Sequence, residues 1–185
     1  MQKWVTLKEK DVSGSKWFPL FKHTVKLPNG TVIDDFYLAR LGAIASMLAV
    51  TPLQEIVLVQ QYRHAVGEVM MELPAGSIEE GTTIEQTAVR ELKEEVGINI
   101  TEADLKPLGV SVPVPHKLDM RVYGYLITDA EVTDTQTLDE LEDIEILKIP
   151  IRDVDTLIKN GEIYQPDTVF FITKARLLYP EVFKI

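Results

Sequence analysis

The stretch that decides the interpretation of this chain is Glu72–Ile98, ELPAGSIEEGTTIEQTAVRELKEEVGI. Apolar residues recur in it at every fourth position: Ile84, Ala88, Leu92 and Val96. This spacing predicts one amphipathic helix. Thr82, with Glu85 three residues later, forms a capping-box pattern that predicts the start of the helix. Gly97 stands where the end of a helix favours a left-handed residue.

The predicted helix carries an unusually dense cluster of acidic side chains. Arg90 is followed within five residues by Glu91, Glu94 and Glu95. On a wheel of about 100° per residue, Glu91 and Glu95 are neighbours at the border of the apolar stripe. A carboxylate turned toward a core is costly unless it is paired or bound to metal, and Mg²⁺ favours oxygen ligands. Because Arg90 can neutralise only one of the three, the spacing leaves two interpretations open, a solvated acidic face and a metal site.

The composition limits the classes of protein. The chain has 185 residues, 45% of them hydrophobic, which predicts one folded domain of ordinary size. A net charge of −10 argues against unspecific nucleic-acid binding. The absence of cysteine fits a reducing compartment and excludes cysteine-ligated zinc. The N-terminus has no signal-peptide pattern, and the longest apolar run, Leu41–Val50, is about half a membrane span. We expect a cytoplasmic protein without nucleic-acid or membrane partners.

Strands flank the predicted helix on both sides. A Pro28–Gly30 turn predicts a hairpin within residues 17–41, and alternating or apolar runs predict further strands. These runs are 43–50, 55–63, 69–76, 105–115, 120–132 and 139–151. Two more helices are predicted in 152–161 and 167–180, which end at Gly161 and before Pro180. Without regular βαβ spacing, this order predicts a mixed α+β or α/β sandwich and not a doubly wound sheet.

The segment resembles the signature of the Nudix hydrolases, G-x5-E-x7-R-E-U-x-E-E-x-G-U, where U is a bulky aliphatic residue. Eight positions match in register: Gly76, Arg90, Glu91, Leu92, Glu94, Glu95, Gly97 and Ile98. Fixed spacing over this many positions makes the signal far more specific than a single glycine motif. Thr82 stands where the family has its first glutamate. We expect folding to survive this change, and some loss of metal organisation is an open consequence.

The resemblance implies a fold, a cofactor and residue roles. The fold would be a Nudix-type αβα sandwich with a mixed β-sheet, and the reaction would be hydrolysis of a nucleoside diphosphate linked to another group. Mg²⁺ or Mn²⁺ would bridge the diphosphate, because metals neutralise its charge and activate water. The implied metal ligands are the Ala75 carbonyl and the carboxylates of Glu91, Glu94 and Glu95, the last two also being assigned catalytic roles. Structural roles fall to Gly76, Arg90 and Gly97.

The flanks of the motif resemble the ADP-ribose pyrophosphatase branch. In QQYRHAVGEVMMELPAG, a Q-Y-R stretch precedes E-L-P-A-G, which implies substrate contacts for Arg63 and a place beside the metal site for Glu72. The branch uses an N-terminal hairpin that is exchanged across a two-fold dimer. We therefore expect residues 1–40 to form a hairpin region used for dimerisation, residues 41–185 to form the Nudix domain, and the protein to be a homodimer. The expected substrate is a small nucleotide sugar, with ADP-ribose first.

The branch takes its general base from a late loop. TLDELEDIEIL supplies Glu140 and Glu142, of which Glu140 is the better positional match, and a solvated acidic loop is the alternative. SVPVPHKLDMRVYGYL lacks the S-P-G-x-x-x-E pattern of many ADP-ribose enzymes, which leaves another nucleotide sugar such as GDP-mannose open. A non-hydrolytic Nudix-fold binding module is disfavoured by the intact R-E-L-K-E-E core. Action on nucleoside triphosphates or capped RNA is disfavoured by the flanks.

Overall fold

The computed structural model describes residues 1–184, which divide into two compact units. The first contains Met1–Gly42 and Val112–Arg121, and the second contains Ala43–Ser111 and the chain from Val122 onward. None of the helices formed by residues 1–184 has the length and apolar character needed to cross a membrane.

The first unit is built on three antiparallel strands, β1 (Val5–Asp11), β2 (Leu20–Lys26) and the first half of β3 (Val32–Val50). The predicted hairpin between β2 and β3 is present, and its turn is closed by a hydrogen bond from the Gly30 N–H to the Leu27 carbonyl at 2.9 Å. The additional strand β1 was not predicted. Every residue of β1 is exposed, so it pairs through its backbone and carries no buried face for a sequence pattern to report.

The second unit contains the rest of the strands. They are β4 (Glu55–Arg63), β5 (Glu68–Glu72), β6 (Ala75–Ser77), β7 (Lys106–Ser111), the second half of β8 (Leu118–Ile127) and β9 (Ile144–Pro150). β4 lies between β5 and β9, β3 pairs with β4, β6 and β8, and β7 pairs with β8. The prediction of separate strands on either side of Gly42 was wrong. β3 continues through this glycine. Its φ is +74°, a left-handed value that glycine adopts readily because it has no β-carbon.

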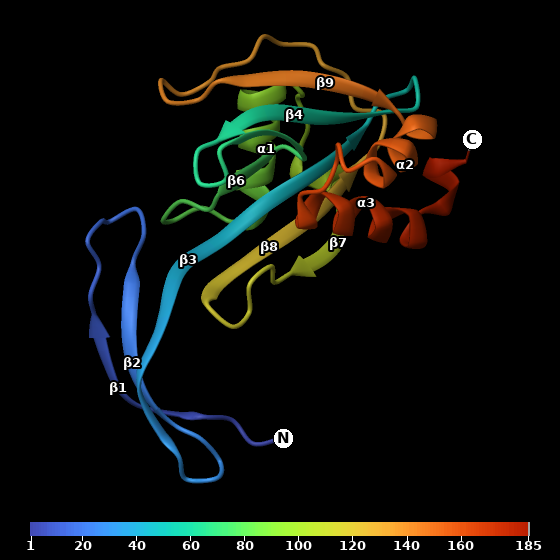
Figure 1. The fold of residues 1–185 in the computed structure, drawn as a ribbon. Helices are drawn as coiled ribbons and strands as arrows, with labels where there is room; N and C mark the ends of the chain where they lie inside the picture. The colour runs from blue at the N-terminus through green and yellow to red at the C-terminus, as the bar shows by residue number, and fades with distance from the viewer. Residues whose placement is uncertain (185) are drawn as a thin grey trace. The chain divides into compact units, whose positions relative to one another are not determined.

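Alternation along the strands separates two faces within the second unit. On β3, Met47 and its odd-numbered neighbours pack in the same core as Leu92 of helix α1 (Ile84–Val96). Gly124 of β8 faces the other way, where an added β-carbon would lie 2.2 Å from the ring of Phe171 in α3 (Pro166–Leu178). The third helix, α2 (Ile151–Lys159), follows β9 directly. Figure 1 shows α1 behind these strands and α3 in front of them, so the predicted mixed α+β sandwich is confirmed.

The ends of α1 are set by local hydrogen bonds. The N-cap is Thr83 and not the predicted Thr82: the Thr83 hydroxyl accepts from the Gln86 N–H, and the Gln86 side chain accepts from the Thr83 N–H. Two adjacent threonines each have a suitable partner three residues on, and the second pair forms the box. Thr82 instead donates to the Glu79 carbonyl at 2.9 Å. The C-terminal prediction is confirmed, since Gly97 is left-handed at φ +67°.

Candidate active site

Two glutamates of α1 are buried at the point where the helix faces β6. Glu91 is 8% exposed and Glu95 is 6% exposed, as their position beside the apolar stripe predicted. Gly76 of β6 is in close contact with the first of them, because an added β-carbon would lie 1.9 Å from a Glu91 carboxylate oxygen. The motif glycine is therefore needed for space, and it lets strand backbone and carboxylate approach each other.

Arg90 binds more of the acidic cluster than the sequence predicted. Its guanidinium donates to Glu94 at 2.6 Å and to Glu91 at 2.7 Å, and it lies 3.3 Å from Glu79. A guanidinium has five donors in a rigid fork, so one arginine can serve several carboxylates at once. Arg90 thus partly neutralises two of the three helix glutamates and leaves Glu95 without an ion pair to it.

Glu95 is the least compensated acid of the cluster. Its carboxylate accepts one hydrogen bond from the Ala75 backbone N–H at 3.0 Å. Burial, and then repulsion by the neighbouring Glu91, raise the pKa of Glu95 to about 8, against the smaller opposing effects of that hydrogen bond and of Arg63. Burial also raises the pKa of Glu91, although Arg90 opposes it. Two buried carboxylates that repel each other form a site that a cation would stabilise.

The residues present fit a divalent metal. The available donors are the Glu91 and Glu95 carboxylates and the backbone carbonyl of Ala75, the oxygen ligands that Mg²⁺ and Mn²⁺ prefer. Among residues 1–184, no three acidic or histidine side chains already converge as a metal cage. Two of the acids, Glu91 and Glu94, are instead held by hydrogen bonds from Arg90.

A cavity of about 230 Å³ borders this cluster. Ala75 and Gly76 line it, together with Arg63 of β4 and Glu72 of β5. The Arg63 Nε donates to Glu72 at 2.7 Å, and Glu72 is 8% exposed. The structure therefore brings the two residues predicted for substrate binding together with the backbone predicted for metal binding.

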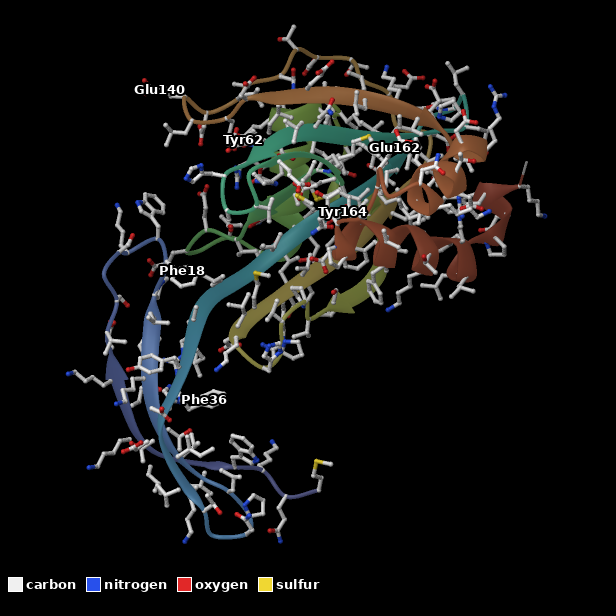
Figure 2. The ribbon with its side chains drawn as sticks, in the orientation of Figure 1. Phe18, Phe36, Tyr62, Glu140, Glu162 and Tyr164 are labelled. Atoms are coloured by element: carbon white, nitrogen blue, oxygen red, sulfur yellow. The ribbon has the colours of Figure 1, made fainter. Side chains whose placement is uncertain are left out.

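The late acidic loop presents its two glutamates differently. Glu140 is exposed, and Figure 2 shows it on the turn that precedes β9. Glu142 is half-buried, and its charge raises the pKa of both Glu91 and Glu95. Glu142 is therefore near enough to the acidic cluster to act on its charge.

Sequence reasoning missed the side of the cavity formed by the start of α3. Gln165, Asp167 and Thr168 all line it, and the Thr168 hydroxyl accepts from the Leu73 N–H at 3.1 Å. The only local signal was a proline at the first helical position, which predicts a helix start and says nothing about a neighbour 95 residues away.

A larger cavity, of about 500 Å³, lies within the first unit. Its lining includes Arg40, Lys117 and Arg121, and none of the motif residues. Arg40 is already engaged there, since it donates two hydrogen bonds to Glu9 at 2.8 and 2.7 Å. Of these two cavities, only the smaller one, in the second unit, is lined by a residue of the motif.

The raised pKa of Glu95 predicts how the metal-free protein responds to pH. A carboxyl whose folded pKa is above its unfolded value binds more protons when folded, so stability falls as pH rises from about 4.5 to about 8. Glu95→Gln should remove roughly 3 to 5 kcal/mol of this fall. Chemical denaturation in a chelator at pH 5 and pH 8 measures it, with exposed Glu131→Gln as the control that follows wild type. Equal stability of Glu95→Gln and wild type at pH 8 would contradict the assignment.

Comparison with known proteins identifies the family. Residues 40–168 match the NUDIX domain, and residues 4–38 match the nucleoside diphosphate sugar hydrolase N-terminal domain. The chain therefore belongs to the Nudix family and is a Nudix hydrolase of the ADP-ribose pyrophosphatase-like kind. Members of this family generally depend on a divalent metal.

Individual relatives cover nearly the whole chain. An ADP-ribose pyrophosphatase of Bacillus subtilis is 31% identical over 173 residues, which are 93% of this chain and 92% of the relative. A methanol dehydrogenase activator of Bacillus methanolicus is 28% identical over 174 residues, with the same shares of the two chains. The crystal structure of an ADP compounds hydrolase has a TM-score of 0.84 and 18% identity, and covers 98% of this chain and 96% of its own. This last likeness shows the fold.

Proposed function

We propose that the protein hydrolyses the pyrophosphate bond of a nucleoside diphosphate sugar with the help of Mg²⁺ or Mn²⁺, and that ADP-ribose, yielding AMP and ribose 5-phosphate, is its first substrate. The observation that carries this proposal is the pair of buried carboxylates, Glu91 and Glu95, beside a cavity that also contains Arg63. The full-length likeness to an ADP-ribose pyrophosphatase supports the choice of substrate.

The chain's own groups would hold the metal as follows. Glu91, Glu95 and the Ala75 carbonyl supply oxygen ligands, and Glu94 supplies a further one directly or through water. When bound, the metal neutralises the diphosphate charge and lowers the pKa of the attacking water. Arg90 keeps Glu91 and Glu94 in place, at 2.7 and 2.6 Å.

Arg63 is the proposed partner of the diphosphate. Glu72 binds one side of its guanidinium, which fixes the orientation of the side chain. The Arg63 side chain is still 45% exposed, so donors remain for a second anion. A planar guanidinium suits phosphate oxygens, because it presents two parallel donors. In this arrangement Glu72 positions Arg63, and both residues line the cavity.

For the general base we favour Glu142 over Glu140, the residue that the sequence pattern ranked first. Glu142→Gln should lower kcat by on the order of 100-fold with little change in KM, the usual size for loss of a general base. Glu140→Gln is the matched control and should change kcat less than about twofold, as expected of an exposed loop residue. The two pH–rate profiles provide a second readout. The opposite ranking of the two variants would return the role to Glu140.

A substrate panel tests the reaction itself. The purified chain is assayed with Mg²⁺ or Mn²⁺ on ADP-ribose, ADP-glucose, GDP-mannose and a nucleoside triphosphate, and the products are resolved by chromatography. The proposal expects AMP and ribose 5-phosphate, with ADP-ribose giving the highest kcat/KM. A preference for GDP-mannose would shift the substrate within the same class, in line with the departure at SVPVPHKLDM. If the protein binds nucleotide sugars without hydrolysing them, the proposed enzymatic function is wrong and the protein is a binding module.

We further propose that residues 1–40 serve dimerisation and residues 41–185 form the catalytic domain. The first unit leaves large apolar side chains exposed, among them Trp17 at 81% and Trp4 at 49%. Aromatic side chains are enriched at interfaces between chains, which supports this proposal. Light scattering at micromolar concentration should give twice the 20.9 kDa of one chain. A measured mass equal to that of one chain would contradict the proposed dimer.

A further inference from the structure

Asp167 is a buried carboxylate with no assigned purpose. It is 7% exposed, lies in the first turn of α3 and lines the same cavity as Arg63 and Ala75. The Ser111 hydroxyl donates to its Oδ1 at 2.5 Å, and the Gln165 amide lies 3.3 Å from its Oδ2. Within residues 1–184, Asp167 makes no salt bridge to a lysine or arginine. A buried carboxylate without a cation carries a desolvation cost, which a binding role at the cavity would explain.

Helix capping does not account for this carboxylate. The cap of α3 is Gln165, whose side-chain oxygen accepts from the Thr168 N–H at 2.6 Å. An acidic residue in the first turn does favour the helix dipole, but that effect is available to an exposed side chain as well. The buried position and the hydrogen bond from Ser111 instead hold the carboxylate in one orientation at the cavity wall.

The chemistry of this wall differs from that of the opposite side. Arg63 and the backbone of Ala75 and Gly76 are suited to phosphate and metal. A fixed carboxylate beside a carboxamide repels phosphate but binds hydroxyl groups well, since the carboxylate only accepts and the amide both donates and accepts. Neighbouring hydroxyls on one ring match such a pair.

We propose that Asp167 and Gln165 recognise hydroxyl groups of the sugar in the nucleotide-sugar substrate and so set the specificity for the group attached to the diphosphate. This inference rests on the proposed function and deepens it. Ser111 acts through Asp167 as a positioning residue. The three residues come from the end of β7 and the start of α3, and meet across 56 residues of chain.

The test compares two substrates that share adenosine diphosphate and differ in the group attached to its terminal phosphate. They are ADP-ribose and the methyl ester of ADP, which has no sugar hydroxyls beyond the diphosphate. Asp167→Asn should lower kcat/KM for ADP-ribose by roughly 10- to 100-fold, the size expected for loss of a charged hydrogen bond, and for the methyl ester by less than about twofold. An equal fall for both substrates, or no fall for either, would overturn the proposal.

Two further variants make the result decisive. The measured ratio is the kcat/KM for ADP-ribose divided by the kcat/KM for the methyl ester of ADP. Gln165→Glu retains the capping oxygen and loses the amide donor, so it should lower this ratio. It replaces Asp167→Asn in the test if that variant does not fold. Asp155→Asn is the matched control, because Asp155 pairs with Arg176 outside the cavity and should leave the ratio unchanged. If wild type cleaves neither substrate, the proposed function fails and the inference with it. If wild type cleaves both and the ratio is the same in every variant, the inference alone fails.

Discussion

Replacement of Glu95 by glutamine should lower kcat on ADP-ribose by on the order of 1000-fold or more, because each 1.4 kcal/mol of lost transition-state stabilisation is about tenfold and a metal contributes several kcal/mol. Glutamine has nearly the same shape and still accepts the hydrogen bond from the Ala75 N–H. The change therefore removes the charge and little of the packing. Steady-state kinetics at saturating Mg²⁺ measures the effect.

The fold of this variant should be intact, which separates chemistry from stability. Loss of a buried, repelled carboxylate should raise the temperature of thermal unfolding at pH 8. Exposed Glu131→Gln removes the same charge away from the cluster and should retain wild-type kcat. Wild-type turnover by Glu95→Gln would remove Glu95 from the mechanism.

Substitution of Gly76 by alanine should reduce activity by on the order of 100-fold, through the position of Glu91 and not through the chemistry of residue 76 itself. The new β-carbon would lie 1.9 Å from the Glu91 carboxylate, far inside van der Waals contact, so the carboxylate must move. We expect the metal concentration needed for half-maximal activity to rise. Activity titrated against Mn²⁺ concentration, with folding checked by thermal unfolding, measures this change.

Gly14→Ala is the matched control, because nothing lies within 4 Å of a β-carbon at that position. It should behave as wild type in the metal titration. If Gly76→Ala keeps both the wild-type metal dependence and the wild-type rate, the close approach of strand and carboxylate has no functional meaning.

Local periodicity predicted the central part of the site. The four-residue repeat of apolar side chains places Glu91 and Glu95 beside the buried stripe, and both are buried in the structure. Gly97 ends the helix in the left-handed conformation that its position predicts. These features depend on residues a few positions apart, where the chain geometry is nearly fixed.

Features that depend on contacts between distant parts of the chain were not predicted from the sequence. Arg90 was expected to serve one carboxylate and contacts three, since Glu79 approaches from the loop before the helix. Asp167 acquires its hydroxyl donor from Ser111 only through tertiary packing. The start of α1 moved by one residue because two adjacent threonines satisfy the same capping pattern, and sequence spacing does not rank them.

The central claim is that the buried carboxylates of α1 bind a divalent cation, and titration calorimetry with Mn²⁺ tests it most directly. At pH 7, Glu95 with a pKa of about 8 is mostly protonated, so metal uptake should release about one proton. The measured heat should therefore vary with the ionisation enthalpy of the buffer, and Glu95→Gln should lose both the binding and this variation. Absence of Mn²⁺ and Mg²⁺ uptake by the wild-type chain, with and without AMP, would contradict the account.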